Sequence, residues 1–317
     1  MKMTVEQAAK LLLQQDHIVI LTHSDPDGDT IGAALGLFYA LEKLGKRASV
    51  KNADDYAIKF ACLINGQQNM VMDEENFIIA VDTADTSLLG SLAAMYEGHI
   101  SLCIDHHPTN KMFAKHTLLD SAAAATCEIV YDVILAMGAP LDAQIASCLY
   151  VGLITDTGCF QHSNTTAKTH RIAAELIEKG IPYNTLNRKF ISVKTRSQIE
   201  LERRSLNTVE YHQGGKVAII TVTLDMMRES CATPEDLDAI TPIARRIEGV
   251  EAGVTIKERE PGVYRISVRT NGILDACKIC ARFGGGGHVR AAGCALTGNL
   301  ESVKAQILSV LDEEIGE

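Results

Sequence analysis

The 317-residue sequence contains no tryptophan, and only 5% of its residues are aromatic. Proteins that coat single-stranded nucleic acid stack bases on aromatic side chains, so this scarcity disfavours that class. No apolar run approaches the ~20 residues that cross a bilayer, and the opening MKMTVEQAAK lacks the apolar stretch of a secretion signal. The nine cysteines are an odd number, which disfavours a disulfide framework. We therefore expect a cytoplasmic protein with reduced thiols and no membrane segment.

Positive charge is also in short supply, because 30 Lys and Arg face 40 Asp and Glu, for a net charge of −10. This balance argues against binding long nucleic acid by charge alone. The charge is uneven, since residues 242–290 hold nine basic and five acidic side chains, a net +4 that leaves −14 for the rest. One part of the chain could attract an anion while another concentrates carboxylates. Ordinary solvated surface charge is the simpler alternative.

The length suggests two domains at ~100–200 residues each. In the first half, short apolar runs alternate with helical patterns. The predicted strands are 17–21, 48–50, 77–81 and 100–104, and the predicted helices are 31–44, 126–136, 143–153 and 166–179. Strands that alternate with helices indicate βαβ units, so we predict an α/β fold whose mostly parallel sheet is flanked by helices.

The second half begins with a polar helical stretch and continues with β-branched strand patterns. These strands are predicted at 216–224, 253–257 and 263–269, and helices flank the glycine run 284–287. We therefore predict an N-terminal domain over 1–186, a helical connector over 187–209 and a smaller C-terminal α/β domain over 210–317. A cleft is expected between the two domains.

Asp and His residues gather after the predicted strands of the first half. Ligands of open parallel sheets bind beyond the carboxyl ends of the strands. The groups follow each other along the chain as residues 22–29, Asp82 with Asp85, residues 105–107, and Asp156 after a helix. One such turn alone is more often a helix cap than a site. Carboxylates from four such groups, crowded at one edge of the sheet, would repel one another and raise each other's pKa. Bound divalent cations would neutralise this repulsion.

The donor types indicate which metal would bind. Carboxylates and imidazoles without a nearby cysteine pair suit Mn²⁺ or Mg²⁺ better than a thiolate-rich zinc site. Their number exceeds the needs of one ion. Two ions ~3.5–4 Å apart that share one carboxylate would use them all, and such pairs activate water against phosphate esters.

Five motifs in this order resemble those of the DHH phosphoesterase superfamily. They are His23-x-x-Pro26-Asp27-Gly28-Asp29, Asp82, Asp105-His106-His107, Asp156-Thr157-Gly158, and Gly285-Gly286-Gly287-His288-x-x-Ala291-Ala292-Gly293. The last resembles the signature of the DHH-associated domain. Length, together with Phe160 and Asn164-Thr165-Thr166, resembles the nano-RNase branch, whose members are bifunctional oligoribonucleases and 3′-phosphoadenosine 5′-phosphate phosphatases.

The resemblance implies a metal-binding role for six residues, in two sets that share Asp82. One Mn²⁺ would be held by His23, Asp27 and Asp82. The second would be held by Asp29, Asp82, His106 and Asp156. Mg²⁺ is a possible replacement, and a water or hydroxide between the two ions would be the nucleophile.

Two further residues of the third motif receive roles from the resemblance. His107 would contact the scissile phosphate to stabilise charge, or protonate the leaving oxygen. Asp105 would orient His106 without touching a metal, because a metal-bound imidazole usually donates its other N–H to an acceptor. Asp25 and Asp85 could support the site in a similar way or simply form turns.

The C-terminal motif implies a substrate-binding role. Gly285, Gly286 and Gly287 would let backbone N–H groups approach a phosphate, and His288 adds a donor. Arg269 fits a strand-borne arginine that the family uses to clamp phosphate. This domain would bind the 5′ end or base of a short substrate. Cys277-x-x-Cys280, a single pair at helical spacing, is interpreted as helix packing.

These features favour a Mn²⁺-dependent phosphoesterase acting on short RNA or DNA oligonucleotides and small adenine nucleotides. A cyclic-di-AMP or linear dinucleotide phosphodiesterase is the alternative within the same chemistry. A catalytically inactive nucleotide sensor is the alternative from another class. Many relatives carry an arginine a few residues after the Asp of the second motif, where this chain has Leu88-Leu89. Any phosphate contact made by that arginine is lost here or supplied by another residue such as Lys111. Family resemblance alone suggests a homodimer.

Overall fold

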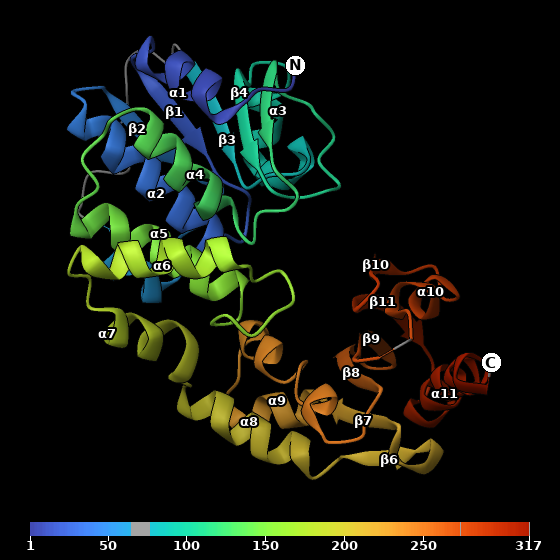
Figure 1. The fold of residues 1–317 in the computed structure, drawn as a ribbon. Helices are drawn as coiled ribbons and strands as arrows, with labels where there is room; N and C mark the ends of the chain where they lie inside the picture. Colours follow the sequence, from blue (N-terminus) through green and yellow to red (C-terminus); the bar gives the residue numbers. More distant parts are fainter. Residues whose placement is uncertain (65–76, 273, 317) are drawn as a thin grey trace. The chain divides into compact units, whose positions relative to one another are not determined.

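The computed structural model describes residues 1–64, 77–272 and 274–316 (Figure 1). The chain forms two compact units, Met1–Val193 and Lys194–Glu317. The first contains a parallel five-stranded sheet and the second a mixed six-stranded sheet, which confirms the predicted α/β class. The domain limits 1–186 and 210–317 and the cleft stay predictions; the connector 187–209 includes the boundary between the units.

The sheet of the first unit has the strand order β2-β1-β3-β4-β5. Its strands are β1 (Ile18–Leu21), β2 (Ala48–Lys51), β3 (Phe77–Val81), β4 (Leu102–Asp105) and β5 (His116–Leu119). The helices are α1 (Val5–Leu13), α2 (Gly28–Lys43), α3 (Ala93–Tyr96), α4 (Thr126–Ala136), α5 (Ala143–Asp156), α6 (Ala167–Glu178) and α7 (Tyr183–Asn187). Short helical turns are η1 (Ile58–Cys62), η2 (Thr86–Leu92) and η3 (Arg188–Ser192).

Helices cover both faces of this sheet, as the pattern of alternating elements predicts. Ile18 and Ile20 of β1 point into the larger core, where they pack with residues of α1, α2, α4 and α5. Figure 1 shows these helices beside the sheet. Val19 and Leu21 point the other way, into a smaller core formed with η2, α3 and Cys103 of β4. Because successive strand side chains alternate in direction, four consecutive apolar residues serve both cores.

Three glycines spaced four residues apart bring α2 into close contact with α5. A Cβ at Gly28 would lie 2.3 Å from the Thr155 hydroxyl oxygen, one at Gly32 would lie 2.4 Å from the Cys148 carbonyl oxygen, and Gly36 faces Leu149. Only glycine allows two helices to approach so closely here. This contact joins the N-terminus of α2 to the C-terminus of α5, where Asp27, Asp29 and Asp156 lie.

The sheet of the second unit has the order β10-β11-β9-β8-β7-β6. Its strands are β6 (Glu210–His212), β7 (Val217–Val222), β8 (Ala252–Glu260), β9 (Val263–Thr270), β10 (Gly286–His288) and β11 (Ala291–Thr297). Its helices are α8 (Arg196–Leu206), α9 (Leu224–Ser230), α10 (Ala276–Ala281) and α11 (Leu300–Gly316), with short turns η4 (Gln213–Gly215), η5 (Pro234–Ala239) and η6 (Ala244–Arg246).

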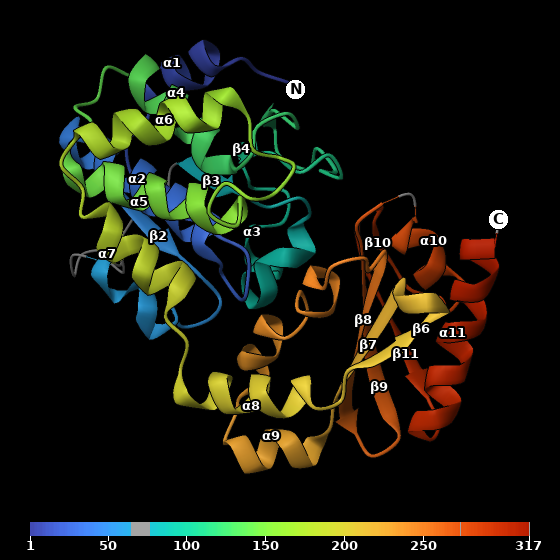
Figure 2. The same cartoon turned by 60° about the horizontal axis from the view of Figure 1, so that its bottom comes forward.

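The two faces of the second sheet are covered differently. α10 and α11 pack on one face, against Val254, Ile266 and Val268 among others (Figure 2). On the opposite face, residues of α8, η5 and η6 pack over β7, against Ala218 and Ile220. The opposite face over β9 and β11 lies outside that cluster.

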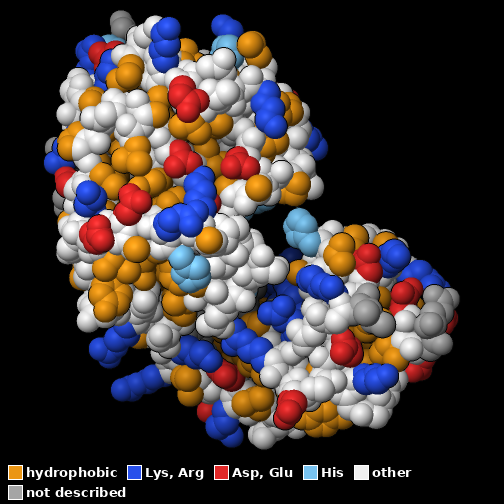
Figure 3. Space-filling view, in the orientation of Figure 1, with side chains coloured by type: hydrophobic (Ala, Val, Ile, Leu, Met, Phe, Trp, Pro, Cys, Tyr) orange, Lys and Arg blue, Asp and Glu red, His pale blue; other side chains and the backbone are white. Residues whose placement is uncertain are grey.

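Charge is mixed over the visible surface, where Lys and Arg alternate with Asp and Glu (Figure 3). Among the described residues, no helix is both long enough and apolar enough to cross a lipid bilayer.

Candidate metal centre

The residues that follow β1, β3 and β4 meet at the carboxyl edge of the first sheet. Asp27 is the N-cap of α2, and its Oδ1 accepts hydrogen bonds of 3.0 Å from the backbone N–H groups of Asp29 and Thr30. His23 Nε2 lies 3.9 Å from Asp27 Oδ1 and 3.8 Å from Asp82 Oδ2. The end of β1 and the start of α2 therefore present their polar side chains to the end of β3.

Asp82 lies at the centre of the group and is only 3% exposed. Its backbone is left-handed, with φ of 53°, a conformation that costs about 1–3 kcal/mol and persists only where contacts impose it. The Asp82 N–H donates to the Ile104 carbonyl at 2.9 Å. The hydroxyls of Thr30 and Thr126 donate to its two carboxylate oxygens at 2.5 and 2.8 Å. Both backbone and carboxylate are thus held in one orientation.

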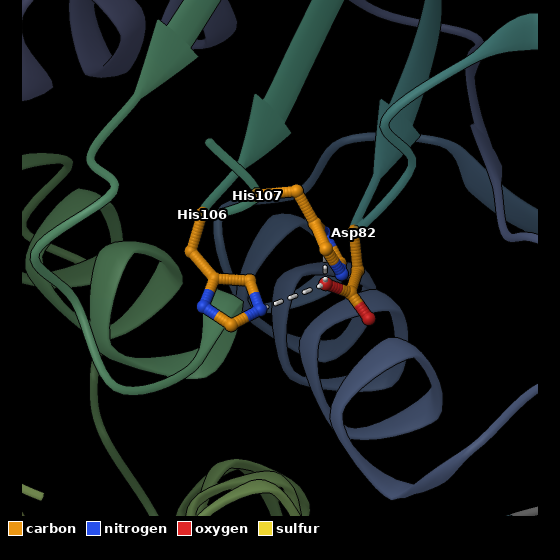
Figure 4. A group of neighbouring side chains, drawn as sticks. All are labelled: Asp82, His106 and His107. Carbon is orange, nitrogen blue, oxygen red and sulfur yellow. Dashed lines mark ion pairs between the residues drawn. The ribbon is translucent and has the colours of Figure 1, made fainter. Parts of the chain in front are cut away.

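His106 and His107 reach Asp82 from the segment after β4, as Figure 4 shows. His106 Nε2 lies 3.8 Å and His107 Nδ1 lies 3.7 Å from the same oxygen, Asp82 Oδ1. His106 Nε2 is also 3.7 Å from Asp156 Oδ2 at the end of α5. These separations exceed hydrogen-bond length, so none of these three nitrogen–oxygen pairs is hydrogen-bonded.

The buried Asp105 contacts the ring of His107 and not that of His106. Its Oδ1 lies 2.8 Å from His107 Nδ1 and accepts from the His106 backbone N–H at 2.9 Å, while Asn110 donates to Oδ2 at 2.6 Å. Burial raises the pKa of Asp105, but the hydrogen bonds from His107 and Asn110 outweigh it and leave the pKa below its usual value. The bond to Asp105 raises the pKa of His107 to about 9.

The ring of His106 is oriented by a backbone carbonyl. Its Nδ1 lies 3.2 Å from the Ala123 oxygen, which leaves Nε2 directed at the carboxylates. This differs from the expectation that Asp105 would orient His106. The physical reason is that Asp105 Oδ1 accepts a hydrogen bond from the His106 backbone N–H. This local bond places the ring of the next residue, His107, beside the Asp105 carboxylate.

Asp29 is buried and caps a helix distant in sequence. Its two oxygens accept from the backbone N–H groups of Thr126 at 2.6 Å and Cys127 at 2.9 Å, the first two residues of α4. The N-cap residue of α4 is Ala125, which has no side-chain acceptor, so Asp29 replaces it. A carboxylate offers about four lone-pair sites, so those not used here remain for a cation.

Asp156 ends α5, and a side-chain amide fixes its backbone. Asn164 Nδ2 donates to the carbonyls of Ala124 at 2.8 Å and Asp156 at 3.3 Å. Ala124 directly follows Ala123, whose carbonyl oxygen contacts His106 Nδ1. Asn164 therefore links the segment that carries Asp156 to the segment that orients His106. Burial raises the pKa of Asp156 to about 6.

The donor atoms fall into groups whose members lie within 4.8 Å of one another. The groups are His23 with Asp27 and Asp82, Asp29 with His106 and Asp156, and Asp82 with His106 and His107. The first has the members of one predicted set, and the second has three of the four members of the other. Asp82 is absent from the second group, although its Oδ1 lies 3.8 Å from His106 Nε2, so the two sets stay predictions. The third group shows that the geometry also allows His107 to be a ligand, besides its predicted contact with phosphate.

Electrostatics indicate that these residues fit a divalent metal. Burial and then the charges of neighbouring carboxylates raise the pKa of Asp29, and burial with the Asp27 charge raises that of Asp82. A doubly charged cation relieves both effects. Carboxylate and imidazole donors without thiolate match Mn²⁺ or Mg²⁺.

The predicted substrate residues all lie in the second unit. His288 on β10 is opposite Ala291 on β11, which is opposite Arg269 on β9, so these three positions form one row across the sheet. The Arg269 guanidinium donates to the carbonyls of Val268 at 3.1 Å and Ala292 at 3.4 Å. His288 is exposed.

Two glycines of the 284–287 run are also required by packing. A Cβ at Gly285 would lie 2.3 Å from the Gly293 carbonyl oxygen, and Gly287, with φ of 146°, would bring one to 2.5 Å from the Ala291 oxygen. A Cβ at Gly286 would meet no atom within 4 Å. Packing therefore explains Gly285 and Gly287 and leaves Gly286 unexplained.

Asp85, Asp25 and His162 each contact a local partner. Asp85 caps η2 through a 2.7 Å bond from the Ser87 N–H and forms an ion pair with Lys111. The Asp25 N–H donates to Asp54 at 2.8 Å, and His162 Nδ1 lies 3.2 Å from the Asp156 carbonyl oxygen.

All nine cysteines lie in the described part of the chain and are free, and their reduced state stays a prediction. Cys280 is fully buried and Cys277 packs against the same core, which confirms their interpretation as helix packing.

Four supporting residues were not singled out by the sequence for a role: Thr30, Asn110, Thr126 and Asn164. Thr30 directly follows the first motif and Asn110 is three residues from His107, so proximity was a usable signal for both. Thr126 and Asn164 act across distances of 44 and 40 residues, on Asp82 and Ala124. Nothing local marks Thr126, and the resemblance that includes Asn164 gave it no role.

Comparisons with known proteins agree with this geometry. Residues 17–153 match the model of the DHH family, N-terminal domain, and residues 214–317 match the DHHA1 domain. The bifunctional oligoribonuclease and PAP phosphatase NrnA of Thermus thermophilus is 35% identical over 94% of this chain and 90% of its own length. The chain belongs to the DHH phosphoesterase family. It is an enzyme of the phosphoesterase type.

The chain is also similar to a second relative in sequence and to a solved structure. The cyclic-di-AMP phosphodiesterase GdpP of Geobacillus thermodenitrificans is 24% identical over 91% of this chain, which spans 46% of GdpP. The crystal structure of an exopolyphosphatase-related protein from Bacteroides fragilis has a TM-score of 0.88 at 23% identity, and covers 98% of this chain and 95% of its own. The latter supports the fold alone.

Proposed function

We propose that this DHH enzyme hydrolyses short oligonucleotides, such as 5′-phosphorylated diadenylate, and 3′-phosphoadenosine 5′-phosphate, with two Mn²⁺ ions. The observation that carries the proposal is that three donor groups lie at one sheet edge and that two of them include Asp82. Similarity to NrnA over 94% of the chain supports the substrate class. Mg²⁺ is the alternative ion.

The first unit would supply the metal ligands. His23, Asp27 and Asp82 would hold one ion. Asp29, Asp82, His106 and Asp156 would hold the other. When bound, such ions neutralise phosphate charge and lower the pKa of water. The protein contributes a fixed donor geometry, because Thr30 and Thr126 hold Asp82 and the α4 N-terminus holds Asp29.

His107 would contact the phosphate that is cleaved. Its side chain is 38% exposed, while Asp105, which fixes its Nδ1, is fully buried. The ring therefore has one anchored nitrogen and one, Nε2, left to stabilise charge or donate a proton to the leaving oxygen.

In the second unit, Arg269 and His288 would bind the terminal phosphate or base of the substrate, with Gly285, Gly286 and Gly287 beside them. Arg269 and His288 share one row of the sheet. An arginine guanidinium can donate two hydrogen bonds to one phosphate.

Hydrolysis of cyclic-di-AMP, or of the linear dinucleotides derived from it, is the second candidate function. Similarity to GdpP over 91% of this chain favours it. The inactive sensor is disfavoured, because all six predicted metal ligands lie at one sheet edge and a site without catalytic use would tolerate their loss. A cytoplasmic homodimer remains part of the proposal.

A substrate panel tests the function. With Mn²⁺ present, we expect fast cleavage of 5′-phosphorylated diadenylate and 3′-phosphoadenosine 5′-phosphate, and little cleavage of a long RNA or pyrophosphate. Protein stripped of metal is the control. Preferential cleavage of cyclic-di-AMP would select the second candidate, and tight dinucleotide binding without turnover would overturn both.

A further inference from the structure

The face of the second sheet opposite α10 and α11 carries rows of residues from β9, β11 and β10. The proposed site of Arg269 and His288 occupies only one of these rows. On β9 the side chains of residues 263, 265, 267 and 269 share this face, since Ile266 and Val268 point into the core under α10 and α11. Their partners on β11 are residues 297, 295, 293 and 291. Strand β10 extends two rows, with Gly286 opposite Gly293 and His288 opposite Ala291.

The rows differ in size and charge. The row of Arg269 and His288 is basic, and the next row consists of Ser267, Gly293 and Gly286. The third row holds Arg265 opposite Ala295. Because the middle row lacks long side chains, the face is hollowed there. The resulting groove of about 500 Å³ is lined by Arg259, Val263, Tyr264, Arg265, Gly286, Gly293, Cys294 and Ala295.

The charge of this groove is not neutralised within the described part of the chain. Arg259 and Arg265 are exposed, and neither guanidinium has an ion pair or hydrogen bond with a described residue. Next to Arg259, the Glu258 carboxylate accepts from the Leu224 N–H at 3.1 Å. A side chain at Gly286 would project into free space, so glycine here keeps the groove open.

Arg265 and Arg269 are four positions apart on one strand, or about 13 Å at ~3.3 Å per residue. The Arg269 guanidinium is held beside its own strand by the Val268 and Ala292 carbonyls, so in this arrangement one phosphate does not contact both guanidinium groups. A chain of phosphates can contact both, if it runs along β9 and β11 over the open middle row.

We propose that the Arg259–Arg265 groove is a second anion site, which binds phosphodiester groups further along the strand whose end lies at Arg269 and His288. The inference rests on the proposed function and specifies its substrate class. A dinucleotide is too short to fill the groove, whereas oligonucleotides of three or more residues engage it. The enzyme then binds longer oligonucleotides more tightly than dinucleotides.

Binding of 5′-phosphorylated oligoadenylates of two to five nucleotides, measured in EDTA to prevent hydrolysis, tests this site. The double variant Arg259→Gln/Arg265→Gln should bind the tetranucleotide about five- to tenfold more weakly and the dinucleotide as the wild type does. Each lost phosphate contact lowers the slope of log K against log salt by about 0.7 for single strands, so the tetranucleotide slope should fall by about 1.4.

Two further variants separate charge, shape and nonspecific effects. Lys278→Gln removes one exposed charge from α10, on the other side of the sheet, and should change neither ligand's affinity. Ala295→Ile fills the groove at an exposed strand position without changing charge. It should weaken tetranucleotide binding selectively, and circular dichroism checks that it is folded.

The outcomes distinguish this inference from the proposed function. If wild-type protein neither binds nor cleaves dinucleotides, the proposed function fails. If it cleaves dinucleotides but binds all lengths equally, or if the double variant keeps the length dependence, the groove assignment is overturned. Stronger competition by inorganic tripolyphosphate than by the tetranucleotide would also overturn it.

Discussion

Asp82 belongs to two of the three donor groups, and two threonine hydroxyls hold its carboxylate. The Asp82→Asn variant keeps the size of the side chain and removes its charge. We expect hydrolysis to fall by at least about 100-fold, equivalent to about 2.7 kcal/mol of lost transition-state stabilisation. Steady-state kinetics with Mn²⁺ measure this. Asp225→Asn, which removes an exposed carboxylate of the second unit, is the control, and near-normal turnover by Asp82→Asn would contradict the shared-ligand assignment.

Asn164 offers a test that does not depend on turnover. Replacing its amide with a carboxylate in Asn164→Asp removes the N–H donor to the Ala124 and Asp156 carbonyls and places an acceptor against them. Loss of such a supporting contact typically lowers metal affinity 10- to 100-fold, which titration calorimetry with Mn²⁺ can detect. In the control Asn184→Asp, the acceptor used by the Thr185 N–H is retained. Equal Mn²⁺ affinity of the two variants would remove Asn164 from the support of the centre.

At this scale, the sequence predicts the residues that carry charge but not those that orient them. His23, Asp27 and Asp82 stand beside strand ends, where local pattern is informative. The partner of the Asp105 carboxylate was misplaced, because motif order does not say which of two adjacent rings turns toward it. Thr126 and Asn164 depend on loops that only the folded chain brings together.

Among the elements, the contact between α2 and α5 governs the geometry of the centre. In Gly32→Val, a branched side chain would overlap the Cys148 carbonyl and force the helices apart. We expect a loss of about 1–3 kcal/mol in the free energy of unfolding, measured by urea denaturation, together with weaker Mn²⁺ binding. Ala143→Val adds the same side chain at an exposed position of α5 and serves as control. Unchanged stability of Gly32→Val would mean that the helices can separate without cost.

Element prediction succeeded where apolar periodicity was strong. The run 77–81 matches β3, and 126–136 matches α4. Strand β5 was missed because its sequence, HTLL, is short and mixed, and its position depends on pairing with β4 and a bridge to Lys2. The predicted strand 100–104 begins only at Leu102. The last two glycines of the run form the edge strand β10 together with His288, since β11 supplies hydrogen-bonding partners that composition does not reveal.

For the whole molecule, metal removal should destabilise one unit selectively. All six predicted ligands lie within Met1–Val193. A ligand at 100 times its Kd stabilises the folded state by about 2.7 kcal/mol, which corresponds to roughly 5–10 °C in Tm for a unit of this size. Differential scanning calorimetry with and without Mn²⁺ should show this rise in one transition. An equal shift in Asp82→Asn would show that the ion binds elsewhere.

The two-unit organisation was predictable from the length and from the change of element pattern along the chain. Acidic side chains outnumber basic ones by 22 to 14 in the first unit and by 18 to 16 in the second, and the net-basic stretch 242–290 lies within the second unit. The counts did not reveal that Arg259 and Arg265 would line one groove, because strand register, rather than the number of charges, decides which side chains share a face.

The spread of the metal ligands along the chain sets the order in which the centre can form during translation. His23, Asp27 and Asp82 leave the ribosome first, whereas Asp156 follows more than seventy residues after Asp82 and needs α5 docked on α2. Contacts between such distant segments form late in folding. The proposed second ion would therefore find no complete site on a nascent chain until the first unit had been almost fully synthesised, and its capture would mark the end of that unit's assembly.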